Sequence, residues 1–492
     1  MLLGIDLGTS SVKVAIVAND GSVTEVATES YAVDSPQPGW AESDPAAWWL
    51  ATRKAVASLD VANLREVEAV GLAGQMHGVV LTSEDGRPLR PAILWADGRS
   101  ETQLESYRAL GPALLRRLGN PLATGMAGPS LLWIKSHEPS VYDSARWALQ
   151  PKDWLRMQLT GKALTEATDA SATLLYDLDK ETWSKDLLQK LDLRPNLLAE
   201  IVSSYDRAGL LTDQSAFELR LDPGIPVAGG AADVAASLVG RGIVDSGPVL
   251  LTIGTGAQLA SVRPDMRPDT TRRTHLYRTI EAGKWYSMAA ILNAGLALEW
   301  VRNLFDVGWE ELYGSMVHSP PGAEGVVFFP YLVAERFPDV DPFAGGSWSG
   351  IELGHRREHL LKAALEGVAF SLREAMEALE ATGCVVSDVQ LAGGGTMDQR
   401  WRQLLADVLG RRLMAFTTPA GSARGAALLG GLAAGVYRSP SDLASLPMTL
   451  ELAAEPGPDT REYTHLYERW CRRRDSNSGL LFRSSSGRPQ VP

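Results

Sequence analysis

Short runs of apolar residues, each ended by a glycine turn, open the chain. Residues 2–5 and 12–17 are apolar, the turn 6–10 lies between them, and the turn 19–21 precedes alternating positions at 23–27. Apolar runs of this length between Gly, Asn and Asp are typical of strands joined by tight turns. We therefore predict an antiparallel meander of three strands, and not the strand–helix start of a dinucleotide-binding unit.

The rest of the chain alternates between strand-like and helix-like patterns. Apolar residues at helical spacing indicate helices, and short continuous apolar runs indicate buried strands. We expect Asp44 to cap a helix whose first turn contains Pro45. The tail 472–492 is rich in Ser and Arg and is predicted to be disordered. The other predicted elements are strands at 67–73, 326–329 and 389–392 and helices at 359–381, 400–409 and 421–434.

The opening pattern recurs in the second half of the chain. An apolar run at 249–253, a glycine–threonine turn at 254–256 and a second run at 258–262 repeat the strand–turn–strand arrangement of the first residues. This recurrence indicates two related halves facing one another, with a boundary near 241–247. Two unrelated hairpins are the alternative, because a match of about five residues is weak support for a duplication.

Composition and charge narrow the class of protein. Of the 492 residues, 45% are hydrophobic and 22% charged, which is typical of a well-cored globular protein. The net charge of −12 argues against nucleic acid or an anionic membrane as partner. Two cysteines, Cys384 and Cys471, are too few for a disulfide framework, and the first residues include Asp6 and lack a basic leader. We expect an α/β protein of the cytoplasm.

Three loops combine glycine with small polar residues at the ends of predicted strands. Successive backbone N–H groups in such turns bind phosphate oxygens without needing lysine. Each loop by itself is better explained as a structural turn, but three of them in one chain favour a nucleotide bound between two lobes. No Gly-x-x-x-x-Gly-Lys-Ser/Thr motif occurs, which argues against a P-loop. The loops contain Gly8, Thr9 and Ser10; Gly254, Thr255 and Gly256; and Gly393, Gly394 and Gly395.

Two acids have unusual neighbours. Asp6 directly precedes the first glycine turn, where a carboxylate would repel phosphate unless a cation lay between them, so Asp6 is a candidate Mg²⁺ ligand. Asp233 follows Ala228-Gly229-Gly230-Ala231-Ala232, a stretch without other polar side chains. It fits two roles, the cap of the helix beginning at Val234 or a general base for a hydroxyl nucleophile.

A polar group of residues follows the predicted strand at 67–73. Met76 and His77 lie between Gly74 and Gly78, and Trp95, Asp97 and Arg99 come shortly afterwards. A ring, an acid and a guanidinium in one short segment are typical of a polyol-binding wall. They are equally typical of a surface ion pair, and a single histidine is more often structural than a ligand.

His355-Arg356-Arg357-Glu358-His359 fits the H-x-x-E-H pattern of inverted zinc peptidases. Zinc binding would require a helix that already includes both histidines. The segment lies at a predicted helix start, which makes this the weaker hypothesis.

The motifs together resemble the FGGY carbohydrate kinases, a family in the superfamily of actin, sugar kinases and heat-shock chaperone ATPases. The resemblance keeps motif order from Met1 to about Tyr437, and the segments 74–78, 91–99 and 149–155 are most similar to the xylulokinases. The motifs that carry it are 5–10, 229–233, 254–256, 393–395 and 359–366, of which the last explains the histidine pair without zinc.

The resemblance implies two ribonuclease-H-like domains with a cleft between them, a sugar-binding domain at 1–243 and a nucleotide-binding domain at 244–471. It implies transfer of the γ-phosphoryl group of ATP to D-xylulose, with ATP and Mg²⁺ as cofactors and a homodimer as one candidate assembly. By carry-over, Asp233 is the general base and a metal ligand, and Asp6 positions Mg²⁺. Met76, His77, Trp95, Asp97 and Arg99 face the sugar. Gly8, Thr9, Ser10, Gly254, Thr255, Gly256, Gly394 and Gly395 bind ATP.

Three positions depart from the family pattern. Val234 stands where Asn or Gln usually follows the catalytic Asp, Ser130 stands where a Lys usually precedes Leu-x-Trp, and Gln258 follows the second glycine turn. Other substrates therefore stay open, namely ribulose, xylitol, glycerol or gluconate. A nucleotide-dependent sugar sensor with weak transfer is the alternative from another class. A chaperone or filament ATPase is disfavoured by the long insertion at 75–176.

Overall fold

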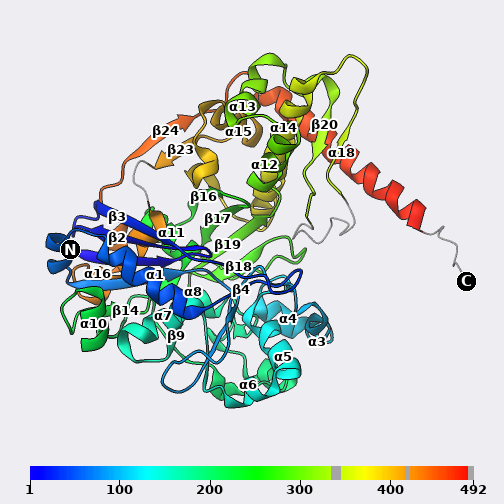
Figure 1. Ribbon diagram of the computed structural model, residues 1–492. Coiled ribbons are helices and arrows are strands. Elements are labelled where there is room, and N and C mark those ends of the chain that lie inside the picture. The colour runs from blue at the N-terminus through cyan, green and yellow to red at the C-terminus, as the bar shows by residue number, and fades with distance from the viewer. Residues whose placement is uncertain (334–344, 417–419, 486–492) are drawn as a thin grey trace, which may run out of the picture.

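Two mixed β-sheets of seven strands each form the two halves of the molecule (Figure 1). The computed structural model describes residues 1–333, 345–416 and 420–485, the last nine of them as backbone alone. The first sheet contains β1 (Leu2–Leu7), β2 (Ser11–Val17), β3 (Val23–Ser30), β5 (Ala69–Gly74), β13 (Arg207–Leu210), β14 (Pro226–Ala228) and β15 (Ala231–Ala232). The second contains β16 (Gly247–Ile253), β17 (Ala257–Arg263), β18 (His275–Arg278), β19 (Trp285–Ile291), β22 (Val386–Ala392), β23 (Leu413–Phe416) and β24 (Leu450–Ala454).

The two sheets share one topology. In the first, β1, β2 and β3 form an antiparallel meander, β5 lies parallel to β1, β14 lies parallel to β5, and β13 closes the edge antiparallel. In the second, β16, β17 and β19 form the meander, β22 and β23 are the parallel strands, and β24 is the antiparallel edge. The expected two-domain α/β fold is confirmed, and the recurrent strand–turn–strand pattern marks equivalent positions in the two halves.

The predicted helices form where the sequence pattern puts them. Asp44 accepts a hydrogen bond from Ala46 N at 2.9 Å and caps α1 (Pro45–Ala57), which has Pro45 as its first residue. The three later predictions correspond to α14 (Arg357–Ala381), α15 (Gln399–Leu409) and α16 (Gly421–Ala433). No helix in the described ranges is both long enough and apolar enough for a bilayer crossing.

The two halves meet where α16 crosses α11 (Asp233–Gly240). Although α16 lies between β23 and β24 of the second sheet in the chain, it packs on β1 and β5 of the first. The apolar side chains of α11 share a buried cluster with residues of β16, β17 and β19 in the second sheet. Helix α16 of the second half therefore contacts the first sheet, and helix α11 of the first half shares a core with the second sheet, so the two helices connect the sheets.

Glycine makes this crossing possible. A Cβ at Gly425 would collide with the carbonyl oxygen of Ala236, and one at Gly240 would collide with that of Gly421. The same holds where α16 meets the first sheet, because a Cβ at Gly4 or Gly71 would also strike a carbonyl oxygen of α16. The helices and the strands are in backbone contact, which no larger residue permits.

A long insertion between β5 and β14 builds the lower part of the molecule in Figure 1. It contains short helices and strands, including α5 (Ala127–His137), β8 (Trp147–Leu149), α7 (Pro151–Thr160), β9 (Leu164–Glu166) and α8 (Ala167–Ala170). Much of it packs around a core of its own, which includes Tyr107, Leu131, Leu175 and Leu187.

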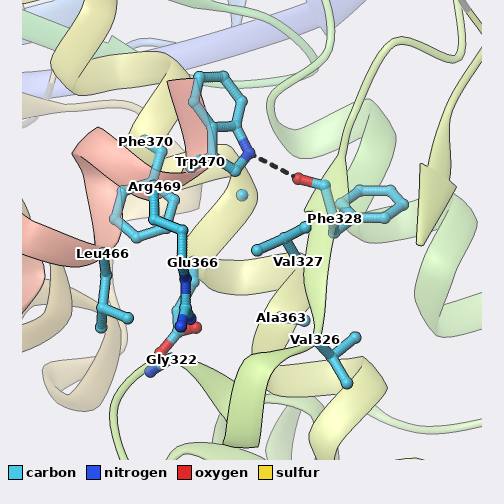
Figure 2. A pocket seen from close by; sticks show the side chains of 11 residues that line it. Gly322, Val326, Val327, Phe328, Ala363, Glu366, Phe370, Leu466, Arg469 and Trp470 are labelled. Atoms are coloured by element: carbon cyan, nitrogen blue, oxygen red, sulfur yellow. Dashed lines mark hydrogen bonds between the residues drawn. The ribbon is translucent and has the colours of Figure 1, made fainter. Parts of the chain in front are cut away.

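The C-terminal helix α18 (Thr460–Ser485) is anchored on α14 and then extends away from the body of the molecule (Figure 1). Trp470 Nε1 donates to Phe328 O at 2.9 Å (Figure 2). Arg474 pairs with Glu374 at 2.6 Å. The predicted disorder from residue 472 is therefore wrong as far as Ser485, because the helix begun at Thr460 continues through it. Residues 486–492 lie outside the described part of the chain.

A buried acid lies beneath this helix. Glu366 of α14 accepts hydrogen bonds from Gly322 N at 2.9 Å and from the hydroxyl of Tyr463 at 3.1 Å, in the crevice shown in Figure 2. Burial raises the pKa of Glu366 to about 7, against the smaller opposite effects of Gly322 N–H, Lys362 and Tyr463.

We predict that Gly425→Ala destabilises the protein by about 1–3 kcal/mol, because its Cβ overpacks a contact between two backbones. Gly314→Ala is the matched control in α13 (Trp309–His318), where the added methyl has room and removes the helix penalty of glycine, worth at most about 1 kcal/mol. Thermal unfolding of both variants checks this. Equal melting temperatures for Gly425→Ala and the wild type would contradict the close crossing.

We predict that Glu366→Gln flattens the pH dependence of stability between about pH 4.5 and 7. In this window the folded protein holds a proton on Glu366 that the unfolded chain releases, so wild-type stability falls as the pH rises. Urea unfolding at several pH values measures the slope. Glu358→Gln, in the first turn of the same helix, is the control and keeps the wild-type slope.

Candidate active site

Asp6 lies in the middle of the first sheet, at the end of β1 that leads into the first glycine turn. It pairs in register with Lys13 of the neighbouring strand. Burial raises the pKa of Asp6 to about 6, against the opposing effects of Lys13 and the Ser422 hydroxyl. Its Oδ1 is buried and accepts no hydrogen bond from any described residue. A buried carboxylate oxygen with an open lone pair is a suitable ligand for a hard cation.

Asp233 is the first residue of α11 and faces the same space. Its Oδ1 accepts a hydrogen bond from Val234 N at 2.7 Å, so the side chain does bind a free N–H of the helix end, while Ala232 is the N-cap residue. The pKa of Asp233 is raised to about 7. Burial is the main cause, and the negative charge of the neighbouring Asp6 makes a smaller contribution in the same direction. The two acids that the sequence singled out are thus electrostatic neighbours, although 226 positions separate them.

A cavity of about 130 Å³ opens beside Asp233. Its walls come from α11, from β16 and β17 of the second sheet, and from the start of α16. Asp233 lies on one side, and Thr252 and Gln258 lie on the strands that enter and leave the turn at 254–256. The cavity therefore extends from the carboxylate to the two strands that flank the second glycine turn. The other lining residues are Val234, Ser237, Leu250, Ala260 and Ser422.

The glycine loops occupy equivalent edges of the two sheets. Gly8, Thr9 and Ser10 join β1 to β2, and Gly254, Thr255 and Gly256 join β16 to β17. Gly394 and Gly395 follow β22, the parallel neighbour of β16, and a Cβ at Gly395 would crowd the side chain of Ile253. The second and third loops are therefore adjacent. Gly254, Thr255 and Gly394 are exposed, and the Gly254 N–H donates to Gly256 O at 2.8 Å within the second turn.

Part of the predicted polyol wall reaches this region. Trp95 Nε1 donates to Thr9 Oγ1 at 2.9 Å, which attaches the indole to the first glycine turn. Met76 Sδ lies 3.7 Å from the hydroxyl of Tyr286, which reaches it from the second sheet. His77 Nδ1 lies 2.8 Å from the carbonyl oxygen of Ala172 and therefore carries the ring proton.

Asp97 and Arg99 are buried and bind each other. Asp97 Oδ1 accepts from Arg99 Nε at 2.8 Å, and its Oδ2 accepts from Ala41 N at 2.6 Å and from Arg99 Nη2 at 2.8 Å. The Arg99 guanidinium lies 3.5 Å over the ring of Trp40 and 2.7 Å from Glu42. Asp97 and Arg99 do form an ion pair, but it is buried and not on the surface as the alternative expected, and the pair fixes the turn that follows Trp95.

The structure contradicts the zinc hypothesis. Helix α14 begins at Arg357, so His355 precedes it. His355 Nδ1 accepts from Glu352 N at 2.7 Å and His359 Nδ1 from Arg356 N at 2.9 Å, which commits both rings to backbone groups at the helix start. Within residues 1–333, 345–416 and 420–485, no three His, Cys, Asp or Glu side chains form a metal-binding group.

Asp6 and Asp233 fit Mg²⁺ better than zinc. Mg²⁺ keeps several of its waters and takes one or two carboxylates together with substrate phosphates, so two acids with an open oxygen suffice.

The sequence pattern of the FGGY family of carbohydrate kinases matches both halves of the chain, its N-terminal domain at residues 1–240 and its C-terminal domain at residues 249–434. The chain belongs to the FGGY family of carbohydrate kinases. Enzymes of this family use ATP, typically with a divalent metal ion.

Relatives in this family align over nearly the whole chain. The xylulose kinase of Escherichia coli (strain K12) is 35% identical over 466 residues, which cover 94% of this chain and 96% of the relative. The gluconokinase of Bacillus subtilis (strain 168) is 26% identical, with 88% of each chain covered. The crystal structure of xylulose kinase from Rhodospirillum rubrum has a TM-score of 0.89 and 30% identity, over 98% of this chain and 99% of that one.

Sequence reasoning missed several residues that this kinase places at the site. Lys13, Ser237, Thr252, Ser422 and Tyr286 come from five different elements, and each is an ordinary residue of its strand or helix. Only Ser422 could have been anticipated from the sequence, because it lies in the first turn of the small-residue helix α16, whose composition predicts close packing.

We predict that Asp6→Asn lowers the pKa of Asp233, because it removes the neighbouring negative charge while burial stays. Carboxyl ¹³C NMR of the metal-free enzyme measures this, with a wild-type midpoint near 7 for Asp233. Asp20→Asn, in the turn between β2 and β3, is the control and leaves the midpoint unchanged. The same midpoint in Asp6→Asn and wild type would contradict the contact between the two acids.

Proposed function

We propose that this carbohydrate kinase transfers the γ-phosphoryl group of ATP to the terminal hydroxyl of D-xylulose, giving D-xylulose 5-phosphate in the cytoplasm. The observation that carries the proposal is the position of Asp233, which borders a cavity that extends to the strands flanking the glycine turn at 254–256 and lies next to Asp6. The similarity to xylulose kinases over nearly the whole chain supports the choice of sugar. The homodimer stays a prediction.

In the proposed reaction Asp233 takes the proton of the attacking hydroxyl. A new O–P bond forms to the γ-phosphorus as the bond to the β-phosphate oxygen breaks, and ADP leaves. A carboxylate with a pKa near 7 is well matched to a general base at neutral pH. Asp6, with Asp233, would hold Mg²⁺, which neutralises charge on the phosphate oxygens when bound.

The glycine turns supply the remaining stabilisation. The N–H groups of Gly8 and Gly254 close their own turns by donating to Ser11 O and Gly256 O. The other backbone N–H groups at 8–10, 254–256 and 394–395 would hold the phosphates and border the adenosine, in a position that needs no lysine. Met76, His77 and Trp95 are proposed to contact the sugar. Asp97 and Arg99 bind each other, so we propose that they position Trp95 and that their effect on the sugar is indirect.

A second candidate is a kinase for another polyol or for gluconate. Val234 is the specific reason, because it places an apolar side chain on the cavity wall beside the base. The similarity to a gluconokinase points the same way. Coupled ADP release with D-xylulose, ribulose, xylitol, glycerol and gluconate separates these substrates, and no turnover with any of them would favour the sugar sensor.

We predict that Asp233→Asn lowers D-xylulose-dependent ADP release by about 10²–10⁴-fold, because the general base is removed. ATP affinity, measured by calorimetry, stays within a few-fold of wild type. Asp192→Asn, an exposed acid paired with Lys135, is the control and keeps full activity. Near-normal turnover in Asp233→Asn would refute the role of the base.

A further inference from the structure

A cluster of five ionisable side chains is completely buried beside the site. Lys152, Asp153 and Arg156 come from α7, Glu166 from the end of β9, and Asp169 from α8, and all five are 0% exposed. Three carboxylates therefore share two cations out of contact with water. Buried charges persist only where partners satisfy them, so each oxygen of this cluster needs a donor.

Asp153 and Glu166 have all the partners they need. Asp153 Oδ1 is bound by Lys152 Nζ at 2.6 Å and Arg156 Nη1 at 3.0 Å, and its Oδ2 accepts from Thr165 Oγ1 at 2.6 Å. Glu166 caps α8, and its two oxygens accept four hydrogen bonds, from Thr168 Oγ1 and N, from Asp169 N and from Ser204 Oγ.

Asp169 is different. Its Oδ1 accepts no hydrogen bond from a described residue, and the nearest donor to its Oδ2 is the ammonium group of Lys152. Lys152 Nζ lies 3.2 Å from Oδ2 as an ion pair, but that ammonium is shared with the two satisfied acids. Asp169 therefore keeps open acceptor positions in a dry environment, where leaving them unfilled is costly.

Asp169 belongs to a segment that lies between Asp233, the proposed base, and His77, which is proposed to contact the sugar. One residue before it, Thr168 Oγ1 accepts from Ala232 N at 2.7 Å, and Ala232 directly precedes Asp233. Three residues after it, the carbonyl oxygen of Ala172 binds His77 Nδ1. The short segment that carries Asp169 is thus tied on one side to the base and on the other to the wall.

The surroundings of Tyr286 also indicate that Asp169 lies near Asp233 and Met76. Its hydroxyl contacts Met76 Sδ at 3.7 Å. Burial raises the pKa of Tyr286 well above its ordinary value, Tyr277 adds to this, and the negative charges of Asp233 and Asp169 both contribute. Tyr286 therefore contacts Met76 directly and lies within electrostatic range of Asp233, Asp169 and Glu166.

We propose that Asp169 is a specificity-determining residue that accepts hydrogen bonds from one or two hydroxyls of the polyol and excludes sugar acids. The proposal rests on the proposed function, since it concerns the same substrate site. Hydroxyl groups can both donate and accept, so they can satisfy the open oxygens of Asp169, which are costly to leave unpaired in a buried site. A sugar carboxylate would instead face Asp169 and Asp233 without a donor between them, so the site selects a neutral polyol.

The test compares Asp169→Asn with Asp153→Asn. Both remove one charge from the same buried cluster, but only Asp169 has open oxygens. We expect Asp169→Asn to raise the KM for D-xylulose about 10–100-fold, to leave the KM for ATP within twofold, and to raise the kcat/KM ratio of gluconate to D-xylulose. Asp153→Asn lowers the melting temperature and leaves that ratio at its wild-type value.

Deoxy sugars identify the contact directly. One of the 1-, 3- and 4-deoxy analogues of D-xylulose should bind wild type more weakly than D-xylulose by the factor lost in Asp169→Asn, and should lose nothing further in that variant. Calorimetry without nucleotide measures this independently of turnover. Asp169→Ser serves if the Asn variant does not fold. Equal D-xylulose affinity in Asp169 variants and wild type, or additive losses for every analogue, would overturn the proposal.

The two proposals fail in different ways. If wild type phosphorylates another polyol of the panel and not D-xylulose, the proposed function is wrong, and the same comparison on that polyol decides the role of Asp169. If wild type prefers gluconate, the exclusion of sugar acids is wrong.

Discussion

The backbone contact between α11 and α16 is the constraint on which the rest of the structure depends. Each helix belongs to one half of the chain and packs on the sheet of the other, so the two sheets are held at a fixed place by one crossing. Gly240 and Gly425 allow carbonyl oxygens to approach where any side chain would collide. The same crossing brings Asp233, the first residue of α11, and Ser422, the second residue of α16, to one cavity. The close backbone contact between the two helices thus determines where Asp233 and Ser422 lie.

Burial next to this crossing determines the charge of the acids. Asp6 lies on a strand and Asp233 at the start of a helix, yet both are buried, and the negative charge of Asp6 adds to the effect of burial in raising the pKa of Asp233. A cation or a proton relieves the cost of burying these charges, and both are needed in phosphoryl transfer. Asp169 has the same problem in the neighbouring buried cluster, where a sugar hydroxyl would relieve it.

Residues of one local motif can serve separate purposes. Trp95, Asp97 and Arg99 are close in sequence, but the indole binds Thr9 of the first glycine turn while the acid and the guanidinium bind each other. The histidines of the H-x-x-E-H segment likewise bind backbone groups at the start of α14. In both cases the residue types were compatible with a ligand site, and the direction of each side chain depended on neighbours that are distant in the sequence.

Local pattern was enough to determine the strands, the cap at Asp44, the glycine turns and the repeated half, because these follow from spacing and from backbone conformations that few residues adopt. It was also enough to single out Asp6, which directly precedes a glycine turn, and Asp233, which follows a stretch of Gly and Ala, although a helix cap stayed open as the role of Asp233. Only the tertiary structure decided that these acids are neighbours, that Lys13, Thr252, Ser422 and Tyr286 join them, and that Asp169 keeps open acceptor positions. The physical reason is that burial and electrostatic contact depend on which segments pack together, and here α16 leaves its own half of the chain to pack on the other.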